Sequence, residues 1–265
     1  MINTRKGERQ SGRVLWDTQS GAAQLSGIRQ IRQGRIILDI PDLMLLPGRR
    51  YALLGANGSG KSTLLQLLAD HLPSPGGEIG YLPQKPHAFT LSVRHNIGLG
   101  IPQQLYPGQQ LRNDLIDRQL EALDLQGLHA ARGSRLSGGE AQRMALARLL
   151  VVPRKVLLLD EPTAALDLDS LTRIEDILCR YLATHNSLMV LATHQFSLAT
   201  RLCDELIFLD RGQVHTSGSL MSCLAALDRP EDPYERLRLF LGYAKTDARS
   251  DPDDAINMRK EATSC

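Results

Sequence analysis

The chain has 265 residues, of which 42% are hydrophobic, and this is enough apolar material for one large domain or two small lobes. Its formal net charge of +2 at pH 7 lacks the basic excess typical of nucleic-acid-binding proteins, so nucleic acid is not an expected partner. No apolar run reaches the roughly 18 residues that a membrane-spanning helix needs, so any membrane role is expected to come through a partner.

The N-terminal third of the chain changes from a polar segment to alternating strands and helices. Residues 1–27 are rich in Gly, Gln, Ser and Arg, which predicts a flexible N-terminal arm. Short apolar runs over residues 28–46, broken by Gly34 and Pro41, predict one or two strands of a sheet lobe. Residues 51–54 then form a predicted buried strand, and leucines over 64–72 mark one face of a helix.

The later pattern predicts an α/β fold. Apolar strands are expected at residues 156–159 and 188–192, with a helix over about 170–183 between them, and this alternation indicates a mainly parallel sheet. The segment ELIFLDRGQVHTSG predicts two strands that turn at residues 210–212. Residues 228–265 are expected to form a C-terminal extension, partly disordered, with one amphipathic helix.

A glycine-rich loop joins the strand at 51–54 to the following helix. It matches G-x-x-x-x-G-K-[ST], in which backbone N–H groups cradle phosphates, Lys61 brings a positive charge to the terminal phosphates and Ser62 ligates Mg²⁺. The alternative is a chance glycine turn, which the flanking strand and helix argue against. The predicted nucleotide-binding residues of this loop are Gly55, Ala56, Asn57, Gly58, Ser59, Gly60, Lys61, Ser62 and Thr63.

Two acidic residues end the apolar strand in VLLLDEP. Asp160 is expected to hold Mg²⁺, directly or through water, and Glu161 to orient or deprotonate the water that attacks the γ-phosphate. The alternative is a solvated acid pair at a strand end. His194, after the strand at 188–192, is a candidate for contact with the γ-phosphate or that water, and Gln84 for contact with Mg²⁺, although each residue alone is also typical of an ordinary loop.

The stretch RLSGGEAQR places two glycines just before a predicted helix over residues 140–150. Ser137, Gly138 and Gly139 therefore lie at a helix N-terminus, where unpaired N–H groups and the positive end of the helix dipole hold a phosphate. The alternative is a flexible turn with no further role. The segment contains no obvious nucleophile, so a binding role is favoured over a chemical one.

Taken in order, these motifs closely resemble the ATP-binding subunit of an ABC transporter over roughly residues 28–219. The resemblance implies the P-loop NTPase fold of an ABC ATPase over residues 28–227, with a mainly parallel core sheet, an antiparallel β lobe and a small helical lobe at about 85–145. It also implies that the turn at Ser137 contacts ATP bound to the P-loop of a second copy. By the same resemblance Asp167 communicates between the two sites, Gln84 links the site to a membrane partner, and His194 is the γ-phosphate switch.

The implied assembly is a dimer that sandwiches ATP and Mg²⁺, bound to transmembrane permease subunits at the cytoplasmic face of the inner membrane and working with a solute-binding protein. A separate ATPase chain resembles the ATP-binding subunits of bacterial importers. The resemblance is to subunits of oxyanion importers, so an oxyanion such as tungstate or phosphate is the expected cargo. Import of a metal ion or an amino acid is the alternative. Two alternative hypotheses are a soluble ABC ATPase that acts on nucleic acid or ribosomes, and a nucleotide-binding regulator that does not hydrolyse ATP.

One feature differs from the family pattern, and one segment allows two interpretations. Many ABC ATPases place an aromatic residue against adenine, whereas Ile31 or Arg32 stands at the corresponding place here. In the segment KPHAFTLSVRHNIGLGI, Phe89, Val93 and Ile97 are candidates for contact with the membrane subunits. The alternative is that these three side chains pack the helical lobe.

Overall fold

The computed structural model describes residues 8–17, 21–72, 78–164, 166–227 and 235–241. Its main sheet has six strands in the order β5-β6-β7-β4-β8-β9, and only the last pair is antiparallel. The mainly parallel sheet confirms the predicted α/β class. The strands are β4 (Arg50–Leu54), β5 (Ile79–Leu82), β6 (Val156–Asp160), β7 (Leu188–Ala192), β8 (Glu205–Asp210) and β9 (Gln213–Ser219).

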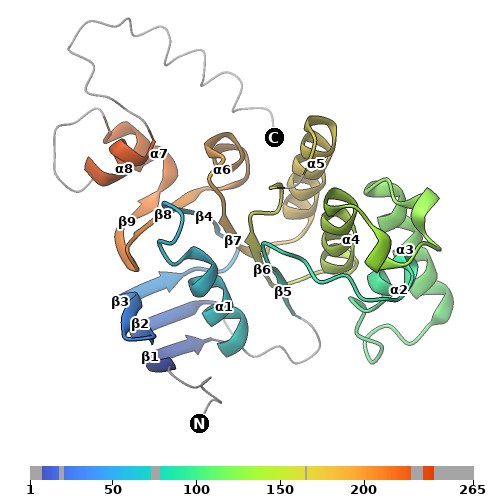
Figure 1. The fold of residues 1–265 in the computed structure, drawn as a ribbon, viewed down its shortest axis with the longest axis horizontal. Helices are drawn as coiled ribbons and strands as arrows, with labels where there is room; N and C mark the ends of the chain where they lie inside the picture. The colour runs from blue at the N-terminus through green and yellow to red at the C-terminus, as the bar shows by residue number, and fades with distance from the viewer. Residues whose placement is uncertain (1–7, 18–20, 73–77, 165, 228–234, 242–265) are drawn as a thin grey trace, which may run out of the picture.

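A separate three-stranded antiparallel sheet forms the predicted β lobe. Its strands are β1 (Glu8–Trp16), β2 (Ala23–Arg32) and β3 (Arg35–Leu45), in that order. Helix α1 (Lys61–His71) lies between this lobe and the main sheet (Figure 1). Pro41 lies inside β3 rather than ending it, because β3 is an edge strand and tolerates a residue without an N–H donor.

The flexible arm predicted for residues 1–27 is wrong where the structure describes it. Residues 8–16 form β1 and residues 23–27 belong to β2, and the two strands pair in antiparallel register. Val14 and Trp16 are half-buried and pack against the core beneath the lobe. The polar composition hid this strand because its backbone bonds depend on β2, which local propensity does not report. Residues 1–7 and 18–20 lie outside the described part of the chain.

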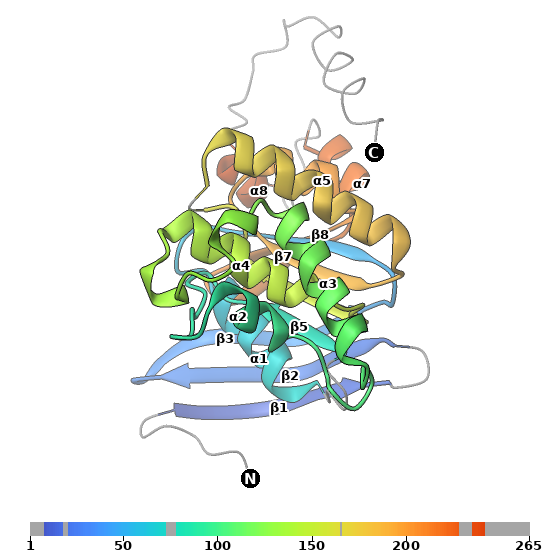
Figure 2. The same cartoon turned by 90° about the vertical axis from the view of Figure 1, so that its right-hand side faces the viewer.

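The remaining helices cover the main sheet and build the helical lobe at one side (Figure 2). No helix among the described residues has the length and apolar character that crossing a membrane requires. The helices are α2 (Val93–Gly98), α3 (Gln109–Ala122), α4 (Gly138–Leu150), α5 (Leu168–Thr184), α6 (Phe196–Leu202), α7 (Leu220–Ala225) and α8 (Glu235–Phe240), with 3-10 turns at Gln126–Leu128 and Gly133–Arg135.

Two hydrophobic cores lie on opposite faces of the main sheet. Side chains alternate along a strand, so Leu157 and Leu159 of β6 face the core that contains α4 and α5, whereas Val156 and Leu158 face α1 and the β lobe. All four are fully buried. Burial on both faces explains why the parallel strands are continuous apolar runs rather than alternating ones.

Two of the three proposed membrane-contact residues belong to the interior. Val93 and Ile97 have no exposed surface, because they lie one turn apart on α2 and pack into the core that includes α4. Their assignment to a surface contact is therefore wrong, and the packing alternative holds for them. Phe89 remains 42% exposed, in the loop before α2.

Part of the C-terminal extension packs on the domain. Leu237 of α8 is fully buried, Phe240 contacts Phe208 with ring centroids 5.6 Å apart, and Arg236 forms an ion pair with Asp210. The amphipathic helix predicted there is therefore present over Glu235–Phe240. Residues 228–234 and 242–265, for which disorder was predicted in part, lie outside the described residues.

A buried asparagine holds the loop before α2. The Asn96 Nδ2 group donates to the carbonyls of Phe89, Leu91 and Ser92, each at 3.1 Å, and its Oδ1 accepts from the Phe89 N–H at 3.1 Å. The side chain has no exposed surface. Four bonds from one amide fix a segment that has no regular structure of its own.

We expect Asn96→Ala to lower the free energy of unfolding by about 2 kcal/mol, because the substitution leaves buried backbone groups without partners. The matched control is Asn113→Ala, which removes an amide from the exposed face of α3 and should change stability by less than about 0.5 kcal/mol. Urea unfolding of both variants measures the difference. Equal effects would contradict a structural role for Asn96.

Candidate functional site

The glycine loop between β4 and α1 presents a helix N-terminus without a side-chain cap. The cap residue is Gly60, in left-handed conformation with φ of 109°, and no side chain accepts a hydrogen bond from the first turn of α1. No acidic residue lies in that turn. The first N–H groups and the positive end of the dipole therefore point to an anion, and a phosphate fits this requirement.

Close backbone contacts hold this loop in shape. A Cβ on Gly55 would lie 2.1 Å from the Leu209 carbonyl oxygen at the end of β8, so only glycine fits there. The Gly212 N–H donates to the Ser59 carbonyl at 2.8 Å, and the Asp39 N–H of β3 donates to the Gly212 carbonyl at 2.8 Å. The turn between β8 and β9 thus joins the loop to the β lobe.

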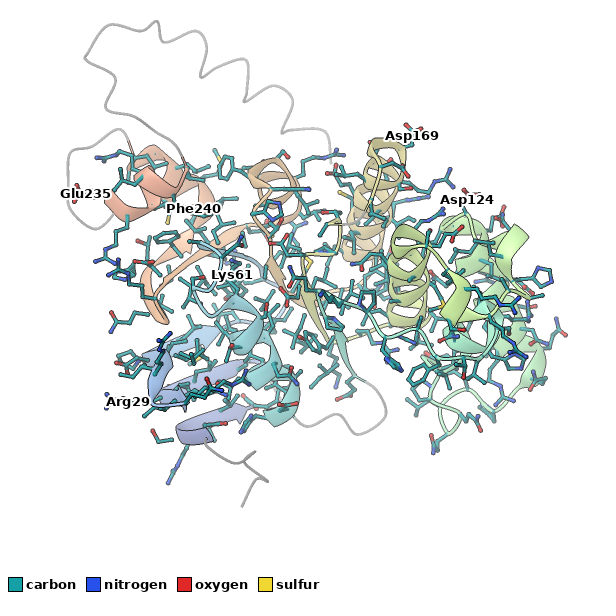
Figure 3. The ribbon with its side chains drawn as sticks, in the orientation of Figure 1. Arg29, Lys61, Asp124, Asp169, Glu235 and Phe240 are labelled. Atoms are coloured by element: carbon teal, nitrogen blue, oxygen red, sulfur yellow. The ribbon has the colours of Figure 1, made fainter. Side chains whose placement is uncertain are left out.

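Lys61 is the first residue of α1 and lies where the helix meets the glycine loop (Figure 3). Its Nζ donates to the carbonyls of Gly55 at 2.7 Å and Ala56 at 3.1 Å. Burial lowers the pKa of Lys61, while the nearby carboxylates of Glu161 and Asp160 oppose that shift. The ammonium group therefore bonds to the predicted phosphate loop and lies within the electrostatic influence of the two acids.

Asp160 ends β6 at the carboxyl edge of the sheet, where ligands of open α/β folds bind. Burial raises the pKa of this carboxyl, and a hydrogen bond from the Ser62 side chain opposes the shift. The backbone of Gln84 also bonds to the carboxylate, and the Gln84 side chain is exposed. The Ser62 hydroxyl and the Asp160 carboxylate together offer the oxygen ligands that Mg²⁺ prefers.

Glu161 follows Asp160 in a strained backbone conformation. Its φ is 49°, and its side chain is almost fully buried. His194 comes just after β7, the neighbouring strand, and its Nδ1 lies 2.9 Å from Glu161 Oε2. The Glu161 N–H donates to the Ala192 carbonyl at 2.9 Å. A non-glycine residue in this region costs about 1–2 kcal/mol, and such strain clusters at functional sites.

The turn at residues 137–139 lies at the N-terminus of α4 and is capped by its own chain. Ser137 Oγ accepts from the Glu140 N–H at 3.4 Å, and Glu140 Oε2 accepts from the Ser137 N–H at 2.7 Å and from its hydroxyl at 2.8 Å. The hydrogen bonds described for the turn remain within α4. Ser137 and Gly138 are exposed, and none of the hydrogen bonds described for the turn reaches the P-loop of the same chain.

Asp167 and the expected base-binding residues lie at the surface. Asp167 caps α5 by accepting a hydrogen bond from the Ser170 N–H at 2.8 Å, and this bond lowers the pKa of its exposed carboxyl. Ile31 is half-buried and Arg32 is exposed at the end of β2, where the chain turns into β3. The apolar and guanidinium alternatives for contact with the base therefore both stay open.

Two polar contacts near Glu161 had no assigned role in the sequence. Gln142 of α4 is almost fully buried and donates to the Pro162 carbonyl at 3.0 Å, and Thr163 Oγ1 donates to Gln195 Oε1 at 3.2 Å. Gln142 was recognisable in principle, because it is a polar residue one turn before Leu146 on the buried face of α4. Gln195 carried no comparable signal.

Comparison with known proteins shows the family to which the chain belongs. The family described as ABC transporter matches residues 38–164. An aliphatic sulfonates import ATP-binding protein from Rhodococcus jostii is 36% identical over 79% of this chain and 76% of its own length. A thiamine import ATP-binding protein from Jannaschia is 34% identical over 79% of this chain and 98% of its own length. The chain therefore belongs to the ABC transporter family, whose ATP-binding subunits are ATPases that power transport.

Solved structures share the fold at lower identity. The ATP-binding subunit of an ABC transporter superposes with a TM-score of 0.69, at 19% identity over 82% of this chain and 98% of that one. A dimeric bacterial ABC transporter cassette, MJ0796, superposes with a TM-score of 0.63, at 24% identity over 70% of this chain and 91% of that one. These neighbours confirm the predicted ABC-ATPase fold.

We expect Gly55→Ala to weaken ATP binding by at least about 10-fold, because the new methyl group collides with the Leu209 carbonyl and displaces the loop. Gly27→Ala is the matched control outside the loop: its φ of 61° costs about 1 kcal/mol for alanine, but a methyl group there meets no atom within 4 Å. Titration with a fluorescent ATP analogue measures both affinities. Similar affinities for the two variants would contradict the role of the close approach.

Proposed function

We propose that this chain is the ATP-hydrolysing subunit of an ABC importer and that two copies enclose ATP and Mg²⁺ head to tail. The observation that carries the proposal is the convergence of Lys61, Asp160 and Glu161 beside the uncapped N-terminus of α1. One cationic group, one metal-binding carboxylate and one carboxylate free to act on water are the parts that phosphoryl transfer requires.

Each of these residues has a distinct task in the proposed reaction. Lys61 exchanges its two carbonyl acceptors for phosphate oxygens, and the loop N–H groups hold the remaining ones. Ser62 and Asp160 hold Mg²⁺, with the Gln84 side chain as a further ligand, and the ion supplies neutralisation of the phosphate charge. Glu161 positions or deprotonates the attacking water, and His194 orients the Glu161 carboxylate and senses the γ-phosphate.

The exposed turn at Ser137 supports the paired arrangement. It lies at the N-terminus of a helix of 13 residues, and Ser137 and Gly138 are exposed there. We propose that Ser137, Gly138 and Gly139 bind the γ-phosphate of ATP held by the second copy. The phosphate must then replace the Glu140 carboxylate as the acceptor of the hydrogen bond from the Ser137 hydroxyl. Asp167 lies on the exposed start of α5 and communicates between the two sites. A structural neighbour described as a dimer supports this arrangement.

Exposed apolar side chains on the helical lobe are the proposed contact with the permease subunits. Phe89 is central, because Arg148 of α4 lies over its ring at 5.3 Å and donates to the His87 carbonyl at 2.8 Å. Arg148 therefore holds the loop and covers one face of the ring, while 42% of Phe89 remains exposed. The exposed set comprises Phe89, Leu91, Leu99, Leu105 and Leu111.

The proposed location is the cytoplasmic face of the inner membrane, bound peripherally to the permease, with a solute-binding protein completing the importer. Relatives named for import support this direction. Oxyanions remain the proposed cargo, supported by relatives named for sulfonates, tungstate and sulfate, whereas others are named for thiamine and nickel. Transport measured with the cognate permease tests the cargo.

Glu161→Gln is expected to slow ATP hydrolysis by on the order of 100-fold and to leave the dissociation constant for ATP unchanged, because the amide keeps the shape of the side chain but cannot accept a proton. Glu205→Gln, at the opposite end of the main sheet's parallel strands, is the control and should retain normal turnover. Phosphate release and nucleotide titration give the two quantities. Unchanged turnover of Glu161→Gln would remove this residue from the proposed role.

Gly138→Leu should bind ATP as a monomer nearly normally but fail to form the ATP-dependent dimer, since the side chain blocks the surface offered to the second copy. Light scattering after size exclusion, with MgATP in the Glu161→Gln background, measures the mass. Gly127→Leu alters another exposed glycine of the same lobe, where nothing lies within 4 Å, and should dimerise. A dimer of Gly138→Leu would overturn the proposed role of the turn.

A further inference from the structure

A buried amide connects helix α4 to the segment that carries Glu161. Gln142 lies in α4, five residues after the helix cap Ser137, and only 2% of it is exposed. A polar side chain buried this deeply requires partners. Its neighbours along the helix, Met144 and Leu146, are apolar core residues, so the position is not explained by packing alone.

The partners of Gln142 are the two carbonyl groups at the start of the catalytic segment. Its Nε2 donates to the Pro162 carbonyl at 3.0 Å and, more weakly, to the Glu161 carbonyl at 3.5 Å. One of these carbonyls belongs to Glu161, whose backbone is strained with a φ of 49°, and the other belongs to the next residue. Since that conformation is unfavourable in itself, it needs such external bonds to persist.

The direction in which the Glu161 carboxylate points depends on this backbone. The Glu161 N–H is held by the Ala192 carbonyl at 2.9 Å, and Glu161 Oε2 lies 2.9 Å from His194 Nδ1. Both of these contacts come from the β7 side of the site. Gln142 approaches from α4, so its hydrogen bonds relate the direction of the carboxylate to the position of α4.

We propose that Gln142 is a positioning residue that couples the turn at Ser137 to Glu161 of the same chain. When ATP held by the second copy binds to the turn, it displaces the N-terminus of α4. The helix transmits this displacement, through Gln142, to the Pro162 and Glu161 carbonyls. Glu161 then reaches its productive orientation only when the opposite site is filled. This inference rests on the proposed dimeric ATPase, and it assigns the route by which one site acts on the other.

The test compares two glutamines, each of which joins α4 to another segment by donating a hydrogen bond to a carbonyl group. Gln142→Met keeps the length and packing of the side chain but removes the amide donor. Gln119→Met is the matched control: Gln119 of α3 donates to the Leu150 carbonyl at 3.3 Å, at the far end of α4. Steady-state hydrolysis of MgATP by the full chain, with thermal unfolding to check folding, measures kcat and KM for each.

Gln142→Met is expected to lower kcat by about 10- to 100-fold with less than about a 3-fold change in KM, because misorientation of a catalytic group affects the transition state more than ATP binding. Gln119→Met should change both by less than about 2-fold. In the Glu161→Gln background, Gln142→Met should still form the ATP-dependent dimer, since the turn itself is intact. If Gln142→Met fails to fold, the equally long Gln142→Glu, whose carboxylate faces the carbonyls, should show the same loss of kcat.

The outcomes separate this inference from the proposed function. A wild-type chain that hydrolyses MgATP, together with equal kcat for the two methionine variants, overturns the role of Gln142 and leaves the proposed function intact. A raised KM with unchanged kcat also overturns it, because the effect would then lie in ATP binding. A wild-type chain without hydrolysis, whose Glu161→Gln variant forms no dimer with ATP, contradicts the proposed function itself.

Discussion

The site depends on the close approach of the glycine loop to the end of β8 and the turn that follows. Gly55 lies against the Leu209 carbonyl so closely that no side chain fits, and Gly212 bonds to the Ser59 carbonyl. Because the loop is held by backbone contacts, the first turn of α1 needs no side-chain cap and keeps its N–H groups for a ligand. The phosphate site is therefore a consequence of how the main sheet supports the loop.

Around this loop the fold concentrates charge in a buried place. Lys61 and Asp160 both lose hydration, and the opposite charges nearby offset only part of that cost. One lysine and two carboxylates sum to a charge of −1, so a divalent cation bound between these carboxylates and a phosphate ligand would reduce the repulsion between them. The strained backbone of Glu161 adds a further cost, and its bonds to β7 and α4 maintain it.

Helix α4 connects the parts of the molecule that have to act together. Its N-terminus carries the turn at Ser137, its buried face presents Gln142 to the segment after β6, and Arg148 near its end holds the loop that exposes Phe89. Since an α-helix of 13 residues is a stiff element, a displacement of the turn, of Gln142 or of Arg148 also moves the other two. The proposed second copy, the catalytic segment and the proposed permease contact thus share one helix.

The sequence by itself determined the parallel core, the phosphate loop and the acids at the strand end, because each rests on a local pattern: an apolar run, a glycine spacing or a residue directly after a strand. It misassigned residues 8–16, whose strand exists through pairing with β2, and Val93 and Ile97, whose burial depends on the position of α4. Only the tertiary structure brought Gln142 to Pro162 and His194 to Glu161, because contacts between residues distant in the sequence follow from packing rather than from local spacing.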